Sequence, residues 1–242
     1  MKNLVIIPTY NEIENIEKII ETTFSLNKNI DILIVDDTSP DGTASKVTEL
    51  INKFTNKLFL INRKQKEGLG KAYITGFKWA ISNNYDTIIE MDADFSHDPI
   101  EIKNLIYKLE NGYDFVIGSR YVKSGKVMNW PFIRRFYSKC ASFLTRIFTG
   151  MPIKDPTSGY VGYNTYSLQA LNLEKIRFVG YAFQIELKYK LWILEKKYCE
   201  IPITFKDRQK GISKMSTKII KEAIIALFTL PKMNKEILNI KD

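Results

Sequence analysis

The chain has 242 residues, of which 45% are hydrophobic, and it carries a formal net charge of +9. A chain of this size can bury a substantial core, as one domain or as a domain with a small appendage. Two cysteines, Cys140 and Cys199, are too few for a disulfide framework, so we expect free thiols in a cytosolic protein. The apolar start is interrupted by Pro8 and does not fit a signal peptide. No apolar run reaches the roughly 18 residues of a membrane-spanning helix.

The first half of the chain alternates short apolar runs with amphipathic helical patterns. Helices are expected after Asn11, as an N-cap, after the turn that ends at Gly42, and after Asp98, where Pro99 fills the first turn and Gly112 ends the helix. The expected strands are nearly all apolar, as strands buried on both faces are. They span residues 4–7, 30–35, 58–61, 87–91 and 115–117. This alternation predicts an α/β fold with a mostly parallel, Rossmann-like sheet sandwiched by helices.

The second half is less regular. Helical patterns cover residues 130–149, 183–197 and 216–230, and a turn-rich loop covers 150–162. A strand is expected at 201–205, before a basic loop at 206–214. The last helix is amphipathic, which predicts a main domain over residues 1–214 and an amphipathic helical segment over 215–242.

Carboxylates close two of the expected strands. Asp36 and Asp37 follow the second strand, and Asp92-Ala93-Asp94 follow the fourth. Open α/β sheets bind ligands at this carboxyl edge. Asp92 and Asp94 can both reach one hard divalent cation, to which Ser96 can add a hydroxyl oxygen. Such a cation would hold a diphosphate, which indicates a nucleotide-dependent transferase. The alternative is a solvated turn that caps the next helix, although Asp98 already serves as that cap. For His97, the only histidine, a structural hydrogen bond is favoured over catalysis.

Two loops at the same edge predict one wall of a nucleoside pocket. They are Pro8-Thr9-Tyr10-Asn11-Glu12 and the segment from Asp36 to Thr43. An acid there can accept hydrogen bonds from a base or ribose, and Tyr10 can pack on a ring. The alternative is two ordinary turns, because Pro-Asp-Gly is a strong turn formula.

A glycine-containing segment, Gly68-Leu69-Gly70-Lys71, only superficially resembles a phosphate loop, because Ala72 stands where the motif needs Ser or Thr. We expect its glycines to let the backbone approach the nucleotide, with Lys71 near phosphate.

Cationic residues predict phosphate sites. Arg120 ends the fifth strand and would point its guanidinium into the crevice. Arg134 and Ser138 share one helix face, which predicts a second phosphate site or, alternatively, a basic surface helix. Arg208 and Lys214 bracket Gly211 in a loop that can close over a diphosphate.

Taken in order, these motifs resemble the family 2 glycosyltransferases of GT-A fold, and among them the polyprenol (dolichol) phosphate mannosyltransferases. The resemblance extends over about residues 4 to 214. It is carried by Pro8-Thr9-Tyr10-Asn11-Glu12, Asp36-Asp37, Ser39, Asp41-Gly42-Thr43, Gly68-Leu69-Gly70, Asp92-Ala93-Asp94-Phe95-Ser96-His97, Gly118-Ser119-Arg120-Tyr121, Asp155-Pro156-Thr157-Ser158-Gly159, Arg208, Gly211 and Ser213-Lys214.

The resemblance implies a GDP-mannose donor, a polyprenyl phosphate acceptor (dolichyl or undecaprenyl), Mg²⁺ or Mn²⁺, and inversion at the sugar carbon. It makes residues 1–214 the GT-A catalytic domain, in the short form that lacks transmembrane helices. Some relatives carry Gln at the position of Ser96, so the third metal ligand is expected to be weaker or water-mediated. The implied catalytic residues are Asp92, Asp94 and Arg120; the metal ligands are Asp92, Asp94 and Ser96; the acceptor phosphate contacts Arg120, Arg134 and Ser138; and the donor contacts Pro8, Tyr10, Glu12, Val35, Asp37, Gly70, Lys71, Asp92, Ala93, Asp94, Arg208 and Lys214.

Two other functions stay open at this point. One is a transferase that uses UDP-glucose or another nucleotide sugar on the same lipid. The other is a basic, non-enzymatic module that binds nucleic acid, which the acids at the strand ends disfavour. The expected partners are therefore the donor, the lipid phosphate and an anionic membrane surface, with no nucleic acid. The protein is expected at the cytosolic membrane face, where either its last helix or a separate anchoring subunit holds it.

Overall fold

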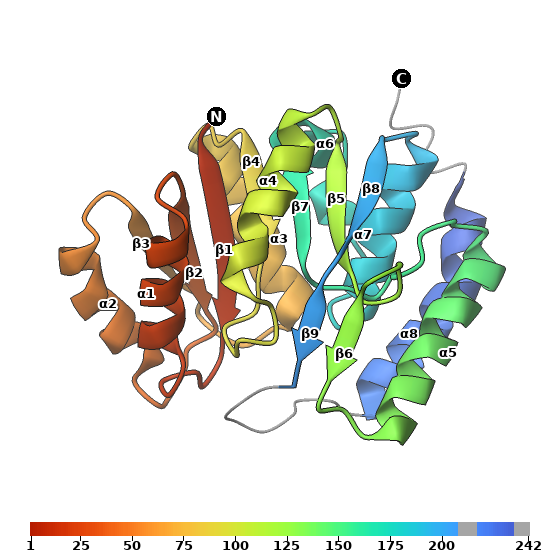
Figure 1. Ribbon diagram of the computed structural model, residues 1–242, viewed down its shortest axis with the longest axis horizontal. Coiled ribbons are helices and arrows are strands. Elements are labelled where there is room, and N and C mark those ends of the chain that lie inside the picture. The colour runs from red at the N-terminus through yellow and green to blue at the C-terminus, as the bar shows by residue number, and fades with distance from the viewer. Residues whose placement is uncertain (208–216, 235–242) are drawn as a thin grey trace.

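A mixed seven-stranded sheet forms the centre of the molecule (Figure 1). The computed structural model describes residues 1–207 and 217–234. The sheet order within them is β3-β2-β1-β4-β7-β5-β8, and only β7 runs antiparallel to its neighbours. Its strands are β1 (Asn3–Thr9), β2 (Asp31–Asp36), β3 (Leu58–Asn62), β4 (Thr87–Glu90), β5 (Phe115–Ser119), β7 (Val161–Asn164) and β8 (Tyr198–Pro202). A separate parallel pair joins β6 (Lys126–Met128) to β9 (Thr204–Lys206).

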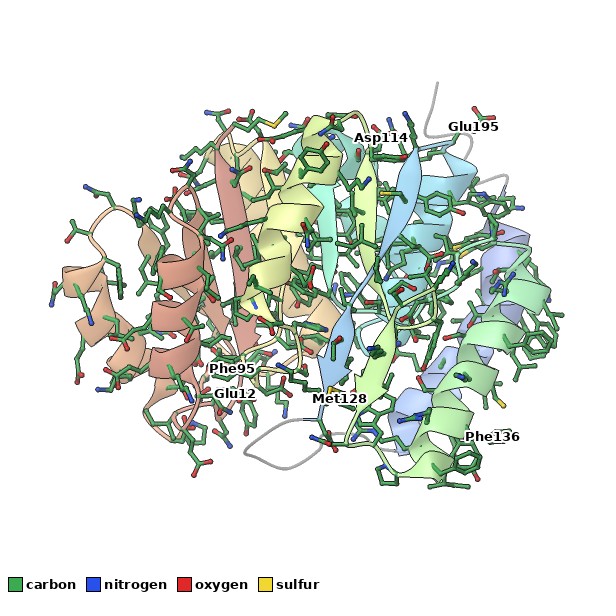
Figure 2. All side chains as sticks on the ribbon, in the orientation of Figure 1. Glu12, Phe95, Asp114, Met128, Phe136 and Glu195 are labelled. Atoms are coloured by element: carbon green, nitrogen blue, oxygen red, sulfur yellow. The ribbon has the colours of Figure 1, made fainter. Side chains whose placement is uncertain are left out.

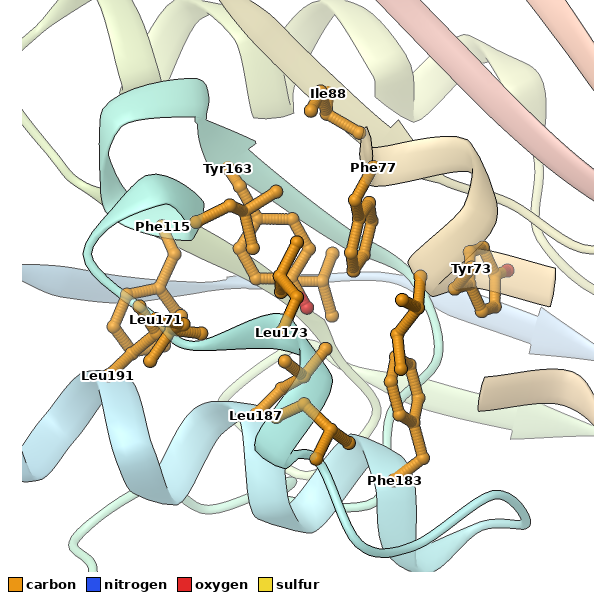
Figure 3. Close-up of a cluster of buried hydrophobic side chains, with 14 of the residues drawn as sticks. Tyr73, Phe77, Ile88, Phe115, Tyr163, Leu171, Leu173, Phe183, Leu187 and Leu191 are labelled. Atoms are coloured by element: carbon orange, nitrogen blue, oxygen red, sulfur yellow. The ribbon is translucent and has the colours of Figure 1, made fainter. Parts of the chain in front are cut away.

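Helices cover both faces of the sheet, because its strands alternate apolar side chains toward each face. On one face lie α1 (Ile16–Leu26), α2 (Thr43–Lys53) and α4 (Ile102–Glu110). On the other lie α3 (Leu69–Ser82), α6 (Thr165–Gln169) and α7 (Ala182–Ile193). Short 3₁₀ turns span Pro99–Glu101, Leu173–Lys175 and Leu230–Met233. Figure 3 shows the second core, where Phe77 packs between Tyr163 and Phe183.

The remaining two helices, α5 (Phe132–Thr149) and α8 (Thr217–Thr229), lie side by side at one end of the sheet (Figure 1). In α8, Ala226 packs into the core, followed by Leu230 and Met233 in the next turn. The carboxylate of Glu222 accepts hydrogen bonds from the backbone N–H groups of Val179 (2.7 Å) and Gly180 (3.0 Å). This helix is thus fastened to the main domain, whereas the domain division at residue 214 stays a prediction.

The five strands predicted in the first half are confirmed, with bounds that shift by one or two residues. Three predictions elsewhere were wrong. The segment 150–162 is not all loop, because β7 begins at Val161. The strand expected at 201–205 is two strands separated by Ile203. The helix expected at 183–197 ends at Ile193, where the backbone turns and Glu195 takes a left-handed conformation with φ 58°.

One predicted helix cap is confirmed and one is wrong. Asp98 accepts a hydrogen bond from Ile100 N–H and caps the turn before α4. Asn11 does not cap α1, which begins four residues after the predicted start with Asn15 as its N-cap residue. Instead Asn11 takes a positive φ of 56° and donates its backbone N–H to Ser39 Oγ, which joins the first two loops.

Candidate active site

The loops after β1, β2 and β4 lie at the carboxyl edge of the sheet, where Figure 2 labels Glu12 and Phe95. Each loop holds one non-glycine residue with positive φ: Asn11 (56°), Thr38 (56°) and Phe95 (61°). This conformation is unfavourable for branched and bulky side chains, and proteins concentrate such strain at functional sites. The three loops therefore form the first candidate for a binding surface.

The two acids that follow β2 have different roles. Asp36 is fully buried and accepts hydrogen bonds from Thr9 Oγ1 (2.7 Å) and from Ser39 N (2.8 Å), so it fastens the two loops together. Asp37 accepts a hydrogen bond from Arg63 at 2.8 Å, and that guanidinium also contacts Glu67 at 2.6 Å. Burial raises the pKa of Asp37, and the Arg63 guanidinium partly offsets this effect.

Two cations that the sequence did not predict complete this wall. Arg63 follows β3, and the ammonium of Lys66 lies 3.7 Å from the centre of the Tyr10 ring. Both lie in the segment that follows the end of a strand, and the search for side chains after strand ends is the rule that found the acids. Had that rule been applied to cations after β3, it would have found them. Tyr10, predicted to contact a nucleoside, thus lies beside the Lys66 ammonium, whose charge suits a nucleotide phosphate, whereas Arg63 is already paired with Asp37 and Glu67.

The turn after β4 gathers the predicted metal ligands. The Asp94 carboxylate accepts a hydrogen bond from Ser96 N–H at 3.0 Å, across the strained residue Phe95. Asp94 is buried, whereas the Asp92 side chain is 38% exposed. The hydroxyl of Ser96 is buried and has no hydrogen-bond partner among the described residues. A buried hydroxyl without a partner costs free energy, which a ligand would recover.

His97 orders this turn. Its Nδ1 accepts a hydrogen bond from the backbone N–H of Asp92 at 3.1 Å, so the ring proton of the neutral form lies on Nε2. The ring stacks on Tyr160 at 4.7 Å. Burial lowers the pKa of His97 to about 4, which keeps the ring neutral. These contacts support the structural role that the sequence favoured.

The donor set fits a hard divalent cation only in part. No group of three or more His, Cys, Asp or Glu side chains gathers within residues 1–207 and 217–234. Asp92, Asp94 and the unpartnered hydroxyl of Ser96 offer oxygen atoms, the ligands that Mg²⁺ and Mn²⁺ prefer. Six-coordinate ions would need the rest from a diphosphate and water, as ions in nucleotide sites do.

Gly70 has a packing reason of its own. A Cβ there would lie 2.7 Å from the Phe183 ring, and its N–H donates to Val179 O at 2.8 Å. The glycine thus lets the first turn of α3 meet residues 178–183. Whether the nucleotide also approaches Gly70 and Lys71 stays a prediction.

Arg120 is held rigidly rather than projecting freely. It forms two parallel hydrogen bonds with Asp155, from Nε (2.8 Å) and from a terminal nitrogen (2.7 Å), and that nitrogen also donates to Thr157. Burial alone would raise the pKa of Asp155, but the Arg120 guanidinium holds it below its usual range. Both side chains are buried, so each depends on the other for its charge partner.

The three residues predicted to contact an acceptor phosphate lie together. The Trp130 ring lies 5.8 Å from the Arg120 guanidinium and 4.1 Å from that of Arg134. The Tyr121 hydroxyl donates to Ser138 Oγ at 2.6 Å. Arg134 also pairs with Asp207, the last described residue before 208–216. Arg208 and Lys214, predicted to form a lid, lie outside the described residues.

A buried polar network lies behind the metal-ligand turn. Glu90 accepts hydrogen bonds from Gln184 (2.8 Å) and Tyr163 (3.2 Å), and the Lys188 ammonium contacts Gln184 and the carbonyl of Ser158. Burial raises the pKa of Glu90 to about 7, although the Lys188 charge works against this. Burial lowers the pKa of Lys188 to about 8.

We expect Glu90→Gln to become more stable relative to the wild type as pH rises. The unfolded carboxyl ionises near 4.5 and the folded one near 7, so the folded state binds more protons between these values. Wild-type stability must therefore fall across that window, by on the order of 3 kcal/mol, and the amide removes this loss. Denaturant titrations at pH 5 and pH 8 measure it. A constant difference between the two proteins would contradict the raised pKa.

The comparisons agree with this geometry. Residues 4–171 match the model of the family described as glycosyl transferase family 2. The chain belongs to this family, whose match covers β1 to β7 and every predicted metal and acceptor residue. Its fold is the GT-A fold, an α/β sheet flanked by helices.

Two relatives are about equally similar to the chain. It is 41% identical over 223 residues to the polyprenol monophosphomannose synthase of Mycolicibacterium smegmatis, covering 92% of this chain and 84% of the relative. It is 40% identical over 225 residues to the undecaprenyl-phosphate mannosyltransferase of Micrococcus luteus, covering 93% and 92%. A solved structure, glucosyl-3-phosphoglycerate synthase from Mycobacterium tuberculosis with Mn²⁺ and UDP, superposes with a TM-score of 0.70. It is 16% identical, with 96% of this chain and 80% of that one covered, and so supports the fold alone.

Proposed function

We propose that this protein transfers mannose from GDP-mannose to the phosphate of a polyprenyl phosphate such as dolichyl or undecaprenyl phosphate. The observation that carries the proposal is the identity of about 40% to two enzymes whose names state a mannosyl transfer to polyprenyl phosphate. It is supported by the strand-end acids at one edge of the sheet and by the Arg120, Arg134 and Ser138 cluster. The donor would lie on the loops with Tyr10 and Asp37.

The chain's own residues would position the reactants. Asp92, Asp94 and Ser96 would hold Mg²⁺ or Mn²⁺, which supplies Lewis-acid stabilisation of the departing diphosphate. Arg63 and Lys66 add positive charge near the nucleoside wall. The donor contacts proposed for Pro8, Glu12, Val35, Ala93, Arg208 and Lys214 complete this half of the site.

The acceptor side needs charge stabilisation more than a base. A phosphate monoester loses its second proton near pH 6, so its oxygen is already a nucleophile at neutral pH. The Asp155 carboxylate accepts two hydrogen bonds from the Arg120 guanidinium, so we assign it no role in proton transfer. Arg120 and Arg134 would bind the lipid phosphate and offset its repulsion from the donor diphosphate. Attack on the face opposite the leaving group would invert the sugar carbon.

Arg134→Ala should raise the KM for polyprenyl phosphate about tenfold and change the KM for GDP-mannose little, because a charge-assisted hydrogen bond is worth about 1.5–3 kcal/mol. Arg134 is half-exposed, so the fold should tolerate the change better than a change at Arg120. The neighbouring Arg135, whose guanidinium bonds the Val127 carbonyl, is the control. Steady-state kinetics with each substrate varied makes the measurement. A larger rise in the KM for GDP-mannose than in the KM for polyprenyl phosphate would mean that Arg134 contacts the donor phosphates rather than the acceptor phosphate.

The surface of α5 supports membrane binding. Its buried side chains are polar and most of its exposed side chains are apolar, with a few cations among them, which is the reverse of a helix packed on a soluble core. Apolar side chains of α8 extend this exposed face, where Phe148 and Phe228 meet at 4.9 Å. Figure 2 labels Phe136 near the N-terminal end of α5, at the edge of the molecule. We call this the α5–α8 surface; its exposed residues are Phe132, Ile133, Phe136, Tyr137, Phe143, Leu144, Ile147, Phe148, Ile224, Ile225 and Phe228.

Contiguous apolar surface of this extent marks an interaction site. None of the described helices is both long and apolar enough to cross a bilayer. The lipid acceptor and the net charge of +9 both favour an anionic membrane as the occupant, at the cytosolic face. An anchoring subunit on the same surface is the alternative partner.

We expect Phe136→Ser with Ile147→Ser to weaken binding to anionic vesicles by at least about tenfold, because each buried side chain contributes about 1.5–3 kcal/mol. Ile100→Ser with Tyr107→Ser, which removes two exposed apolar side chains from another face, is the matched control. Co-sedimentation measures the loss. If both double variants bind as the wild type does, the α5–α8 surface is not the membrane contact.

A panel of nucleotide sugars tests the donor. Purified protein should transfer hexose from GDP-mannose to polyprenyl phosphate at a far higher kcat/KM than from UDP-glucose or UDP-galactose. A preference for a uridine nucleotide would favour the alternative transferase and leave the lipid acceptor in place.

A further inference from the structure

A basic pocket of about 320 Å³ lies beside α5. It opens between one side of that helix, the segment that follows β5, and the segment just before Asp155. Its volume is at the small end of the range for ligand sites, about 300–1,000 Å³, and suits a head group better than a nucleotide sugar. Side chains that line it include Arg120, Lys139, Ser142, Phe143, Arg146 and Lys154.

The charges in this pocket are unbalanced. The described residues that line it include four cations and no Asp or Glu. Asp155 neutralises Arg120, but Lys139, Arg146 and Lys154 form no ion pair with any carboxylate in the described parts of the chain. Like charges held around one pocket repel each other, and an anion between them would relieve this repulsion.

The pocket differs from the proposed acceptor-phosphate site. Arg134 and Ser138 do not line it, although Tyr121, whose hydroxyl donates to Ser138 Oγ, does. Arg146 follows Ser138 by eight residues, which places it about 12 Å further along the helix axis. Arg120 and Tyr121 border both sites, so they are neighbours with one shared wall.

The rim of the pocket identifies the kind of anion. Phe143 lines the pocket, is 58% exposed and belongs to the α5–α8 surface. An occupant would therefore have its charge among the cations and apolar atoms beside Phe143. Amphiphiles with a phosphate head have this form, and Lys and Arg are the side chains that bind phosphate oxygens.

We infer that this pocket binds the phosphate head group of a membrane lipid and holds it beside the transfer site. The inference rests on the proposed membrane function. The head group can come from polyprenyl phosphate, in which case the pocket receives the acceptor before it reaches Arg134. It can also come from an anionic phospholipid, in which case the pocket anchors the protein.

Vesicle co-sedimentation with the full chain tests this. The vesicles are phosphatidylcholine alone, phosphatidylcholine with polyprenyl phosphate, and phosphatidylcholine with phosphatidylglycerol. Arg146→Ala with Lys154→Ala changes two exposed pocket cations. Lys28→Ala with Lys103→Ala, two exposed lysines in a separate pocket, removes the same charge as a control. Affinity for a phosphate-bearing vesicle should fall about tenfold or more in the first variant only.

The outcomes separate the possibilities. Loss on polyprenyl phosphate vesicles alone assigns the pocket to the acceptor, and loss on both kinds assigns it to anionic head groups in general. Equal losses in the two double variants, or none in either, overturn the pocket assignment. Phe136→Ser with Ile147→Ser distinguishes the two proposals: if it abolishes binding while the pocket variant does not, membrane docking stands and the inference alone fails.

Discussion

Asp94→Asn should lower the rate of mannosyl transfer by about a hundredfold or more while leaving the fold intact. The loss follows because an amide replaces one of the anionic ligands that would hold the divalent cation, and that cation stabilises the departing diphosphate. The fold should survive because the amide oxygen can still accept the hydrogen bond that Ser96 N–H donates to Asp94. The measurements are kcat, the midpoint of thermal unfolding, and the affinity for Mn²⁺ in the absence of substrate.

Asp98→Asn is the matched control, because Asp98 lies in the same segment but caps the next helix and pairs with Lys206. Its amide keeps the cap, and we expect near wild-type activity and Mn²⁺ affinity. Full activity of Asp94→Asn, or unchanged turnover after the metal is removed with EDTA, would refute the metal assignment.

Asp155→Ala should lower the free energy of unfolding by about 3–5 kcal/mol, because it leaves the buried Arg120 guanidinium without its carboxylate. Transfer should also fail at temperatures where the variant stays folded, since Arg120 loses two hydrogen bonds that fix its position. Denaturant titration and single-turnover kinetics measure the two effects separately.

Two further variants test the cause of this loss. Arg120→Met with Asp155→Leu should be less destabilised than Asp155→Ala, since replacing both partners leaves no buried charge alone. Glu174→Ala, which breaks the exposed pair with Lys78, should change stability little. If Arg120→Met with Asp155→Leu is less stable than Asp155→Ala, the loss of stability in Asp155→Ala does not come from leaving the Arg120 charge unpaired.

The Asp155 contribution also has a predicted pH dependence. The folded pKa lies below the ordinary value of 3.8, so the folded carboxyl binds fewer protons than the unfolded one. The stabilisation is present above pH 3.8 and is lost as pH falls through the folded pKa.

The core of the fold was predictable because its strands are apolar on both faces. Parallel strands between helices leave continuous apolar runs, and the acids that end them, Asp37, Asp92 and Asp94, stand out in one sequence. The antiparallel strand β7 gave no such signal, because Gly162 and Asn164 interrupt its apolar pattern and it lies between other strands rather than beside its sequence neighbours.

Contacts between distant segments could not be predicted. Asp155 lies 35 residues from Arg120, and nothing local in the chain shows that the two are paired. Arg63 and Lys66 follow β3 in the chain, so the strand-end rule could have found them, but their contacts with Asp37 and Tyr10 depend on the packing of the loops. These pairs depend on tertiary packing rather than on spacing along the chain.

The sequence also could not predict which face of α5 is buried. The sequence shows a helix with basic residues along it, but a polar stripe normally faces solvent. Here Ser142, Thr145 and Thr149 are buried while Phe132 and Ile147 are exposed. Only the three-dimensional structure shows which face is covered. The face left exposed forms the proposed membrane contact, and one side of the helix lines the basic pocket.

The most direct test of the central proposal is the mass of the lipid product. Purified protein is incubated with GDP-mannose, polyprenyl phosphate vesicles and Mg²⁺, and the extracted lipid is analysed by mass spectrometry. We predict a polyprenyl phosphate that has gained one hexose, formed by the wild type and by Asp98→Asn but not by Asp94→Asn. An unmodified lipid with the folded, membrane-bound wild type, for every nucleotide sugar tried, would contradict the proposed transfer.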